Sequence, residues 1–143
     1  SNADGTIDFK GISLFATRGG AYLGNILATE ADKREMLSRY ADLALVDSVS
    51  ERICNILSAH FKGVYEGAFG VDMMAVARED GDGFMLHPCV ELNLRRTMGH
   101  LALALTPTIA EPQRIMSISY ADKYRMRIHD TAKNLLNTSM VTP

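Results

Sequence analysis

Apolar and polar residues alternate along six short segments of the chain. This alternation predicts β-strands, in which successive side chains point to opposite faces. The segments are 8–17, 21–27, 69–78, 84–93, 114–120 and 124–129. Arg18-Gly19-Gly20 predicts a tight turn between the first two, because glycine accepts the positive φ angles of hairpin turns. A phosphate-binding loop is the alternative for this glycine pair, but the strand–loop–helix order of such loops is not matched, so the hairpin turn is favoured.

Apolar residues spaced three and four apart predict helices elsewhere in the chain. The clearest helix begins at the capping box Ser48-x-x-Glu51, follows an apolar stripe to Phe61 and ends near Gly63. The other expected helices are 29–39 with Thr29 as N-cap, 98–105 with Thr97 as N-cap, and a short one at 130–137. Helices mixed with hairpins in this order predict an α+β fold, with a mainly antiparallel sheet and helices packed on one face.

The composition is that of an ordinary globular domain, with 47% hydrophobic and 22% charged residues among 143. A net charge of −2 argues against a nucleic-acid coat and against a polybasic membrane anchor. Two cysteines are too few for a disulfide framework or a four-thiolate zinc site. No apolar stretch approaches the roughly 20 residues that span a bilayer, so a cytoplasmic protein is expected.

Residues 1–3, Ser-Asn-Ala, resemble the remnant of a cleaved affinity tag and are set aside. The length of residues 4–143 suits one α+β domain with its own core. A tag remnant also implies that an experimenter chose the boundary. We therefore expect the natural protein to extend upstream.

The segments 69–78 and 84–93 are expected to form one hairpin, because Asp80-Gly81-Asp82-Gly83 between them is a strong turn signal. With Gly81-Asp82 as a two-residue turn, Asp72 lies opposite Glu91. A register shift of two residues would keep both side chains on one face, whereas a shift of one would separate them.

The two faces of this hairpin differ in character. One face is uniformly apolar and is expected to pack under the helices; its residues are Phe69, Val71, Met73, Ala75, Ala77, Phe84, Leu86, Val90 and Leu92. The other mixes apolar, acidic and amide groups; its residues are Asp72, Met74, Val76, Arg78, Met85, His87, Cys89, Glu91 and Asn93. Because two facing carboxylates repel in a bare sheet, a cation between them is the favourable arrangement.

Asp72, Glu91 and Asn93 are therefore the candidate metal ligands. A few oxygen ligands, open to water and phosphate, suit Mg²⁺ (or Mn²⁺) better than zinc. Arg95 and Arg96 follow closely, where a guanidinium can hold phosphate oxygens or a developing charge. Two structural alternatives stay open: Asp72 is a solvated surface acid, or one of the arginines neutralises Glu91 in an ion pair.

His87 and Cys89 lie on the same predicted face and suggest two further alternatives. Zinc bound by these residues with Asp72 is disfavoured, because three or four tetrahedral ligands are not obvious. A Cys89 nucleophile with His87 as base would need the two side chains in contact, and nothing in the sequence supports that contact.

Two motifs together resemble the closing half of the ATP-grasp fold: Gly70-Val71-Asp72 on one strand and Glu91-Leu92-Asn93-Leu94-Arg95 on its partner. The resemblance covers about residues 8–105 and leaves 106–143 as a C-terminal extension. It implies that Asp72, Glu91 and Asn93 bind the Mg²⁺ ions that bridge the ATP phosphates. It also implies that Asn93, Arg95 and Arg96 bind the nucleotide phosphates, with Arg95 as the catalytic residue.

The implied function is that of the Mg-ATP phosphate-binding lobe of an ATP-dependent ligase. Such enzymes join a carboxylate to an amine or thiol through an acyl-phosphate, so ATP and a small carboxylate are the expected ligands. The family clamps adenine between two lobes, so an upstream nucleotide-binding lobe is expected and this fragment alone is not expected to be active. The alternatives are a catalytically inactive scaffold or interaction domain, and a simple small-molecule or metal-binding module.

Overall fold

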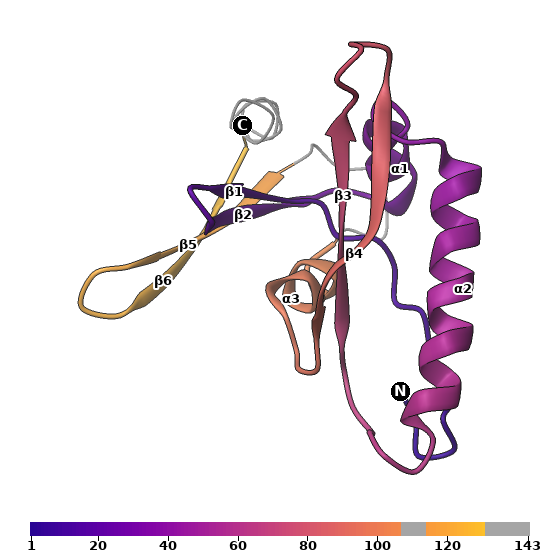
Figure 1. Ribbon diagram of the computed structural model, residues 1–143. Coiled ribbons are helices and arrows are strands. Elements are labelled where there is room, and N and C mark those ends of the chain that lie inside the picture. The colour runs from indigo at the N-terminus through magenta and orange to yellow at the C-terminus, as the bar shows by residue number, and fades with distance from the viewer. Residues whose placement is uncertain (107–113, 131–143) are drawn as a thin grey trace. The chain divides into compact units, whose positions relative to one another are not determined.

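The computed structural model describes residues 1–106 and 114–130, and their secondary structure confirms the α+β class (Figure 1). The chain forms two compact units, one of residues 1–10 and 34–97 and the other of 11–33 and 98–143. Every strand pair in the described residues is antiparallel. The single-domain organisation stays a prediction. The helix expected at 130–137 falls almost wholly outside the described residues.

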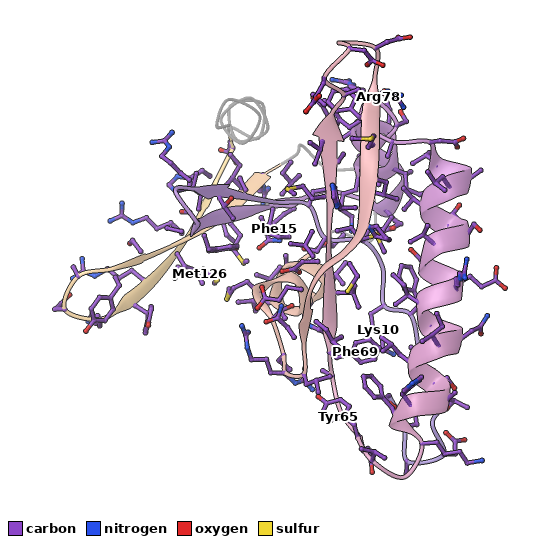
Figure 2. All side chains as sticks on the ribbon, viewed as in Figure 1. Lys10, Phe15, Tyr65, Phe69, Arg78 and Met126 are labelled. Atoms are coloured by element: carbon purple, nitrogen blue, oxygen red, sulfur yellow. The ribbon has the colours of Figure 1, made fainter. Side chains whose placement is uncertain are left out.

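The first unit holds helix α2 (Leu43–Phe61) and the hairpin of β3 (Gly70–Ala77) and β4 (Phe84–Asn93). In Figure 1, α2 runs alongside this hairpin. The ring of Phe61 packs 5.1 Å from that of Phe69 and 5.2 Å from that of Tyr65, between centroids. Figure 2 shows Tyr65 and Phe69 at this end of the helix.

At the other end of the hairpin, the ring of Phe84 meets Tyr40 edge-on at 5.3 Å. Of these two contacts only the one with Phe61 involves a helical residue, because Tyr40 lies in a turn before α2. Val90 and Leu92 on the same face are exposed. The prediction of a fully covered apolar face was only partly right.

Helix α2 begins five residues earlier than the predicted capping box. Asp42 is its N-cap, and its carboxylate accepts a 2.8 Å hydrogen bond from the Ala44 backbone N–H. Buried Val46 extends the apolar stripe upstream, so tertiary packing continues the helix through Ser48. The predicted end was right, since Gly63 follows the C-cap with φ +71°.

The second unit holds a four-stranded sheet in the order β1-β2-β5-β6. The strands are β1 (Phe15–Arg18), β2 (Ala21–Leu27), β5 (Arg114–Tyr120) and β6 (Tyr124–His129). The ranges of β2, β5 and β6 match the prediction, whereas β1 is much shorter than the predicted strand 8–17. Gly19 and Gly20 both have positive φ in the β1–β2 turn, which confirms the hairpin reading. The segment treated as a C-terminal extension thus contributes β5, which pairs with β2.

A small apolar core joins this sheet to helix α3 (Met98–Ala104). Leu27 on β2, Met116 on β5 and Ala102 on α3 are buried against one another, with Met98 packed beside them. Helix α1 (Glu30–Leu37) follows β2, and the Thr29 hydroxyl caps it by accepting from the Asp32 N–H at 3.2 Å. Among the helices that the structure describes, none combines the length and apolar character needed to cross a membrane.

Two buried polar side chains also hold this unit together. Lys33 is fully buried, donates to the Ile12 carbonyl at 2.5 Å and pairs with the Glu30 carboxylate at 2.8 Å. Asn25 on β2 is also fully buried; it accepts from the Tyr22 hydroxyl and donates to the Ser13 hydroxyl at 2.6 Å. Each buried group is thereby satisfied, as a protein interior requires.

Candidate metal and phosphate site

The β3–β4 hairpin places the two predicted acidic ligands directly opposite each other. Asp72 on β3 pairs with Glu91 on β4, and Gly70 pairs with Asn93 at the next same-face position. Side chains on one strand that are two residues apart share a face, so Asp72, Glu91 and Asn93 lie on the same side of the hairpin. The structure thus brings these three predicted residues together.

The turn of this hairpin differs from the prediction. The ladder near the turn pairs Ala77 with Phe84, and the Arg78 N–H donates to the Gly83 carbonyl at 3.0 Å. The connection is therefore a four-residue loop, Glu79–Asp82, and not the two-residue turn Gly81-Asp82. Within it the Asp80 carboxylate accepts from the Asp82 N–H at 3.1 Å, a local bond that stabilises the longer loop.

An irregularity in β4 then restores the predicted pairing. Met74 pairs with His87 and Asp72 with Glu91, so three residues, Pro88–Val90, stand opposite the single residue Met73. Pro88 has no N–H to give to the ladder, and proline inside a strand is confined to edges and bulges. The offset is two residues, an even number, so Glu91 keeps the face that it shares with Asp72.

Asn93 links the acidic pair to the arginine that follows. Its amide nitrogen points at the Asp72 carboxylate, with Nδ2 3.5 Å from Oδ2, a long contact. Opposite Asn93, Gly70 has no side chain, and a Cβ there would come within 3.1 Å of Thr97 Cγ2. Gly70 therefore leaves room beside Asn93 that the Thr97 side chain partly fills.

Arg95 lies two residues beyond Asn93, just after the end of β4. Its guanidinium donates to Asn93 Oδ1 at 2.9 Å, and its backbone N–H donates to the Asn93 carbonyl at 2.9 Å. The short turn made by these bonds brings the cation back to the acidic pair. Buried Asn93 thus has its amide oxygen engaged by Arg95 and its amide nitrogen directed at Asp72.

The electrostatics of Asp72 reflect this arrangement. Partial burial raises the pKa of Asp72 above its ordinary value of 3.8, the facing Glu91 carboxylate raises it further, and the Arg95 guanidinium opposes both. One guanidinium thus offsets only part of the cost of ionising Asp72 beside Glu91. An added cation would relieve what remains.

The donor chemistry fits Mg²⁺ or Mn²⁺ and does not fit zinc. In residues 1–106 and 114–130, no three or more His, Cys, Asp and Glu side chains are gathered in a way that could hold a metal ion. The site offers two carboxylates, together with an amide oxygen that accepts a hydrogen bond from Arg95. Mg²⁺ is commonly held by one or two carboxylates together with water and substrate phosphates, so this partial set suits it.

The remaining candidates are less tightly placed. Arg96 is exposed and makes no hydrogen bond or ion pair with another described residue, so its role in phosphate binding stays a prediction. His87 is on the ladder opposite Met74, and Cys89 lies in the irregular stretch, exposed. The His87–Cys89 nucleophile stays a hypothesis without a supporting contact.

Two residues that shape the site were not predicted to do so: Pro88 was given no role, and Thr97 was expected only as the N-cap of helix 98–105. A proline within an alternating segment is the signal that could have located the irregularity of β4. Comparison with known protein families, with curated proteins and with solved structures finds no match to this chain. The likeness to ATP-grasp enzymes therefore stays a prediction from the sequence motifs.

Proposed function

We propose that the β3–β4 hairpin is the Mg²⁺- and phosphate-binding element of an ATP-dependent ligase of the ATP-grasp kind. Such a ligase activates a small carboxylate as an acyl-phosphate for attack by an amine or thiol. The observation that carries the proposal is the pairing of Asp72 with Glu91, with Asn93 and Arg95 bonded beside them.

Each residue has a role that follows from its chemistry. Asp72 and Glu91 would hold the cation, with Asn93 as a third oxygen ligand. Arg95 would contact phosphate oxygens, for which a guanidinium is well suited, and stabilise charge as it develops during transfer. The metal, when bound, supplies charge neutralisation on the phosphates and fixes their orientation.

The hydrogen bond between Arg95 and Asn93 would couple metal binding to phosphate binding. Asn93 Oδ1 accepts from Arg95 in the structure, so a cation at this oxygen would be repelled by the guanidinium until Arg95 turns to another acceptor. A phosphate oxygen is such an acceptor. Metal and phosphate are therefore expected to bind more tightly together than either does alone.

An inactive scaffold and a simple metal-binding module are the competing proposals, and they differ in this coupling. A scaffold need not bind metal at all. A simple module would bind the cation without phosphate and would not need Arg95. Neither alternative predicts that metal and phosphate bind more tightly together.

The test uses Mn²⁺ as the metal and sodium tripolyphosphate as the phosphate ligand, with free Mn²⁺ followed by electron paramagnetic resonance. We expect tripolyphosphate to increase Mn²⁺ binding to the chain beyond the binding by tripolyphosphate itself. Asp72→Asn and Glu91→Gln should each weaken the ternary binding by about tenfold or more. Arg95→Ala should remove the effect of tripolyphosphate while leaving weak Mn²⁺ binding.

Asp82→Asn is the matched control, because Asp82 is an exposed acid on the loop of the same hairpin. It should bind like the parent chain. Equal Mn²⁺ binding by the parent, Asp72→Asn and Glu91→Gln would refute the metal site. Phosphate-independent binding that survives Arg95→Ala would favour the simple module over the ligase.

A further inference from the structure

The β5–β6 hairpin reaches beyond the strand that supports it. Pairing of β2 with β5 stops at Gly24 opposite Ser117, so residues 118–120 of β5 pair with β6 alone. Figure 1 shows the hairpin projecting from its sheet. Within the described residues β6 has one neighbour, β5, so its other edge is free. A free edge presents unpaired backbone N–H and C=O groups that can pair with another strand.

One face of this hairpin is apolar and exposed. Tyr120 is 67% exposed and Tyr124 79%, and their rings pack against each other with centroids 4.9 Å apart. Met126 and Ile128 follow Tyr124 on the same face of β6, each about half exposed. Figure 2 shows Met126 on this hairpin. An exposed run of large apolar side chains is typical of a binding surface.

The opposite face of β6 is basic. Arg125, Arg127 and His129 alternate with the apolar residues along the strand. Arg125 pairs with Asp122 at 3.2 Å, and His129 lies 3.1 Å from the Ser117 hydroxyl, whereas Arg127 makes no ion pair with another described residue. The edge strand is thus apolar on one side and cationic on the other.

We propose that the free edge of β6 binds an extended segment of a partner protein in which apolar and acidic residues alternate. The segment would add a strand to the sheet by backbone pairing, a common mode of peptide recognition. Its apolar side chains would lie beside Tyr124, Met126 and Ile128. Its carboxylates would lie beside Arg125 and Arg127, where opposite charges across a strand pair are favourable.

The same pattern disfavours a second copy of this chain as the occupant. Pairing of two β6 strands that keeps the apolar faces together sets each arginine opposite another basic residue. In the symmetric antiparallel register centred on Met126, for example, Arg125 lies opposite Arg127 of the other copy. Like charges directly opposite destabilise a strand pair. Residues 131–143, which follow β6, contain no acidic residue, so that segment does not supply the complementary charge either.

Nucleic acid is also a poor match. Single-stranded nucleic acid stacks its bases on aromatic rings while basic side chains in the same groove hold its phosphates. Here Tyr124 and Arg125 are neighbours on a strand, so the tyrosines and the arginines point to opposite faces of the sheet. An edge-paired peptide uses both faces at once.

The test measures the binding of a labelled synthetic peptide that alternates valine and glutamate, by fluorescence anisotropy with the full chain. Two control peptides have the same residues in two blocks, or lysine in place of glutamate. We expect the alternating Val–Glu peptide to bind at least about tenfold more tightly than either control. Amide signals of β6 should shift in NMR spectra when it binds.

Charge reversal gives the decisive comparison. The double variant Arg125→Glu, Arg127→Glu should lose about tenfold in affinity for the Val–Glu peptide and gain affinity for the Val–Lys peptide. Arg39→Glu, Arg52→Glu is the matched control: it removes two exposed arginines of the other unit and should behave like the parent chain. If the double variant does not fold, Arg127→Glu alone should show a smaller loss of affinity for the Val–Glu peptide and a smaller gain for the Val–Lys peptide.

Three results would overturn the proposal. The first is equal binding of the alternating and blocked peptides. The second is binding that charge reversal at β6 leaves unchanged. The third is evidence that another molecule occupies the β6 edge. That evidence would be a dimer, seen by sedimentation, that Tyr124→Ser dissociates, or displacement of the peptide by oligothymidine.

Discussion

Asp72 and Glu91 face each other across β3–β4 because two departures from a simple hairpin compensate. The loop Glu79–Asp82 and the irregular stretch Pro88–Val90 each displace the register by two residues relative to a hairpin with the turn Gly81-Asp82. Because both displacements are even, the acidic pair remains on one face. Their even size keeps the two carboxylates on one face, and their cancellation restores the direct pairing.

Removing residues from β4 tests this parity. Deleting Pro88 and Cys89 together leaves Val90 opposite Met73 and Glu91 opposite Asp72, with no residue left over. We expect a fold within about 1 kcal/mol of the parent in urea unfolding and Mn²⁺–tripolyphosphate binding within about threefold. Deleting Cys89 alone should lower stability and Mn²⁺–tripolyphosphate binding more than the double deletion does. Regular pairing would then set Glu91 opposite Val71. Greater damage from the double deletion would contradict this account.

The predicted pairing of Asp72 with Glu91 was right although the turn behind it was wrong. Alternation of side chains is a property of each strand, and it survives any even shift, so the face of each residue could be predicted. The loop could not, because Asp80-Gly81-Asp82-Gly83 offers several turns of similar local energy. Pro88 could have located the irregularity of β4, since a proline in the middle of a ten-residue strand marks an irregular ladder.

Errors elsewhere came from tertiary contacts. The Ser48-x-x-Glu51 pattern is a valid local start signal, but burial of Val46 favours continuing the helix back to Asp42. Segment 8–17 alternates like a strand, yet only Phe15–Arg18 is in the sheet, where it pairs with β2. Strand formation depends on a partner, which alternation alone does not supply.

Asp72→Asn should stabilise the folded chain while weakening metal binding. The pKa of Asp72 is raised above 3.8 in the folded state, so keeping it ionised costs stability at neutral pH. That cost disappears as the pH falls below 3.8, where the group is protonated in both states. We expect the variant to gain about 0.5 kcal/mol at neutral pH and nothing at low pH, measured by urea unfolding. A loss of stability at neutral pH would indicate a structural role for the carboxylate.

Arg95 should be the main cation that keeps the pKa of Asp72 from rising further. Arg95→Ala removes the charge and the bond to Asn93, so the pKa of Asp72 should increase relative to the parent. Arg95→Lys retains a charge without the planar donor fork and should give a smaller increase. Carbon-detected NMR titration of the Asp72 carboxyl in the parent chain and both variants would show whether its pKa rises in this order. Identical titration in all three proteins would mean that Arg95 is too far away in solution to matter.

The buried Lys33 should depend on Glu30 as its ion-pair partner. Among the described residues, Glu30→Ala leaves the fully buried ammonium with the Ile12 carbonyl as its one partner, and we expect a loss of about 2–3 kcal/mol. Lys33→Met removes the buried charge itself and leaves a half-exposed Glu30 in contact with water, so about 1 kcal/mol should be lost. Urea unfolding of both variants gives the comparison. The reverse order would show that Lys33 matters through its packing and not through its pairing.

Tyr22 should make the second unit sensitive to high pH. Burial raises the pKa of Tyr22 from 10.0 to about 12, and its hydroxyl donates to the buried Asn25 oxygen. Between those values the unfolded chain loses a proton that the folded chain keeps, so stability falls as the pH rises. Because solvent screens the half-buried ring, we expect a contribution of only about 1 kcal/mol. Tyr22→Phe should start less stable at pH 8, since Asn25 loses its donor, and should then lose less stability between pH 10 and 11. Parallel pH curves for the two proteins would show that the phenol titrates alike in the folded and unfolded states.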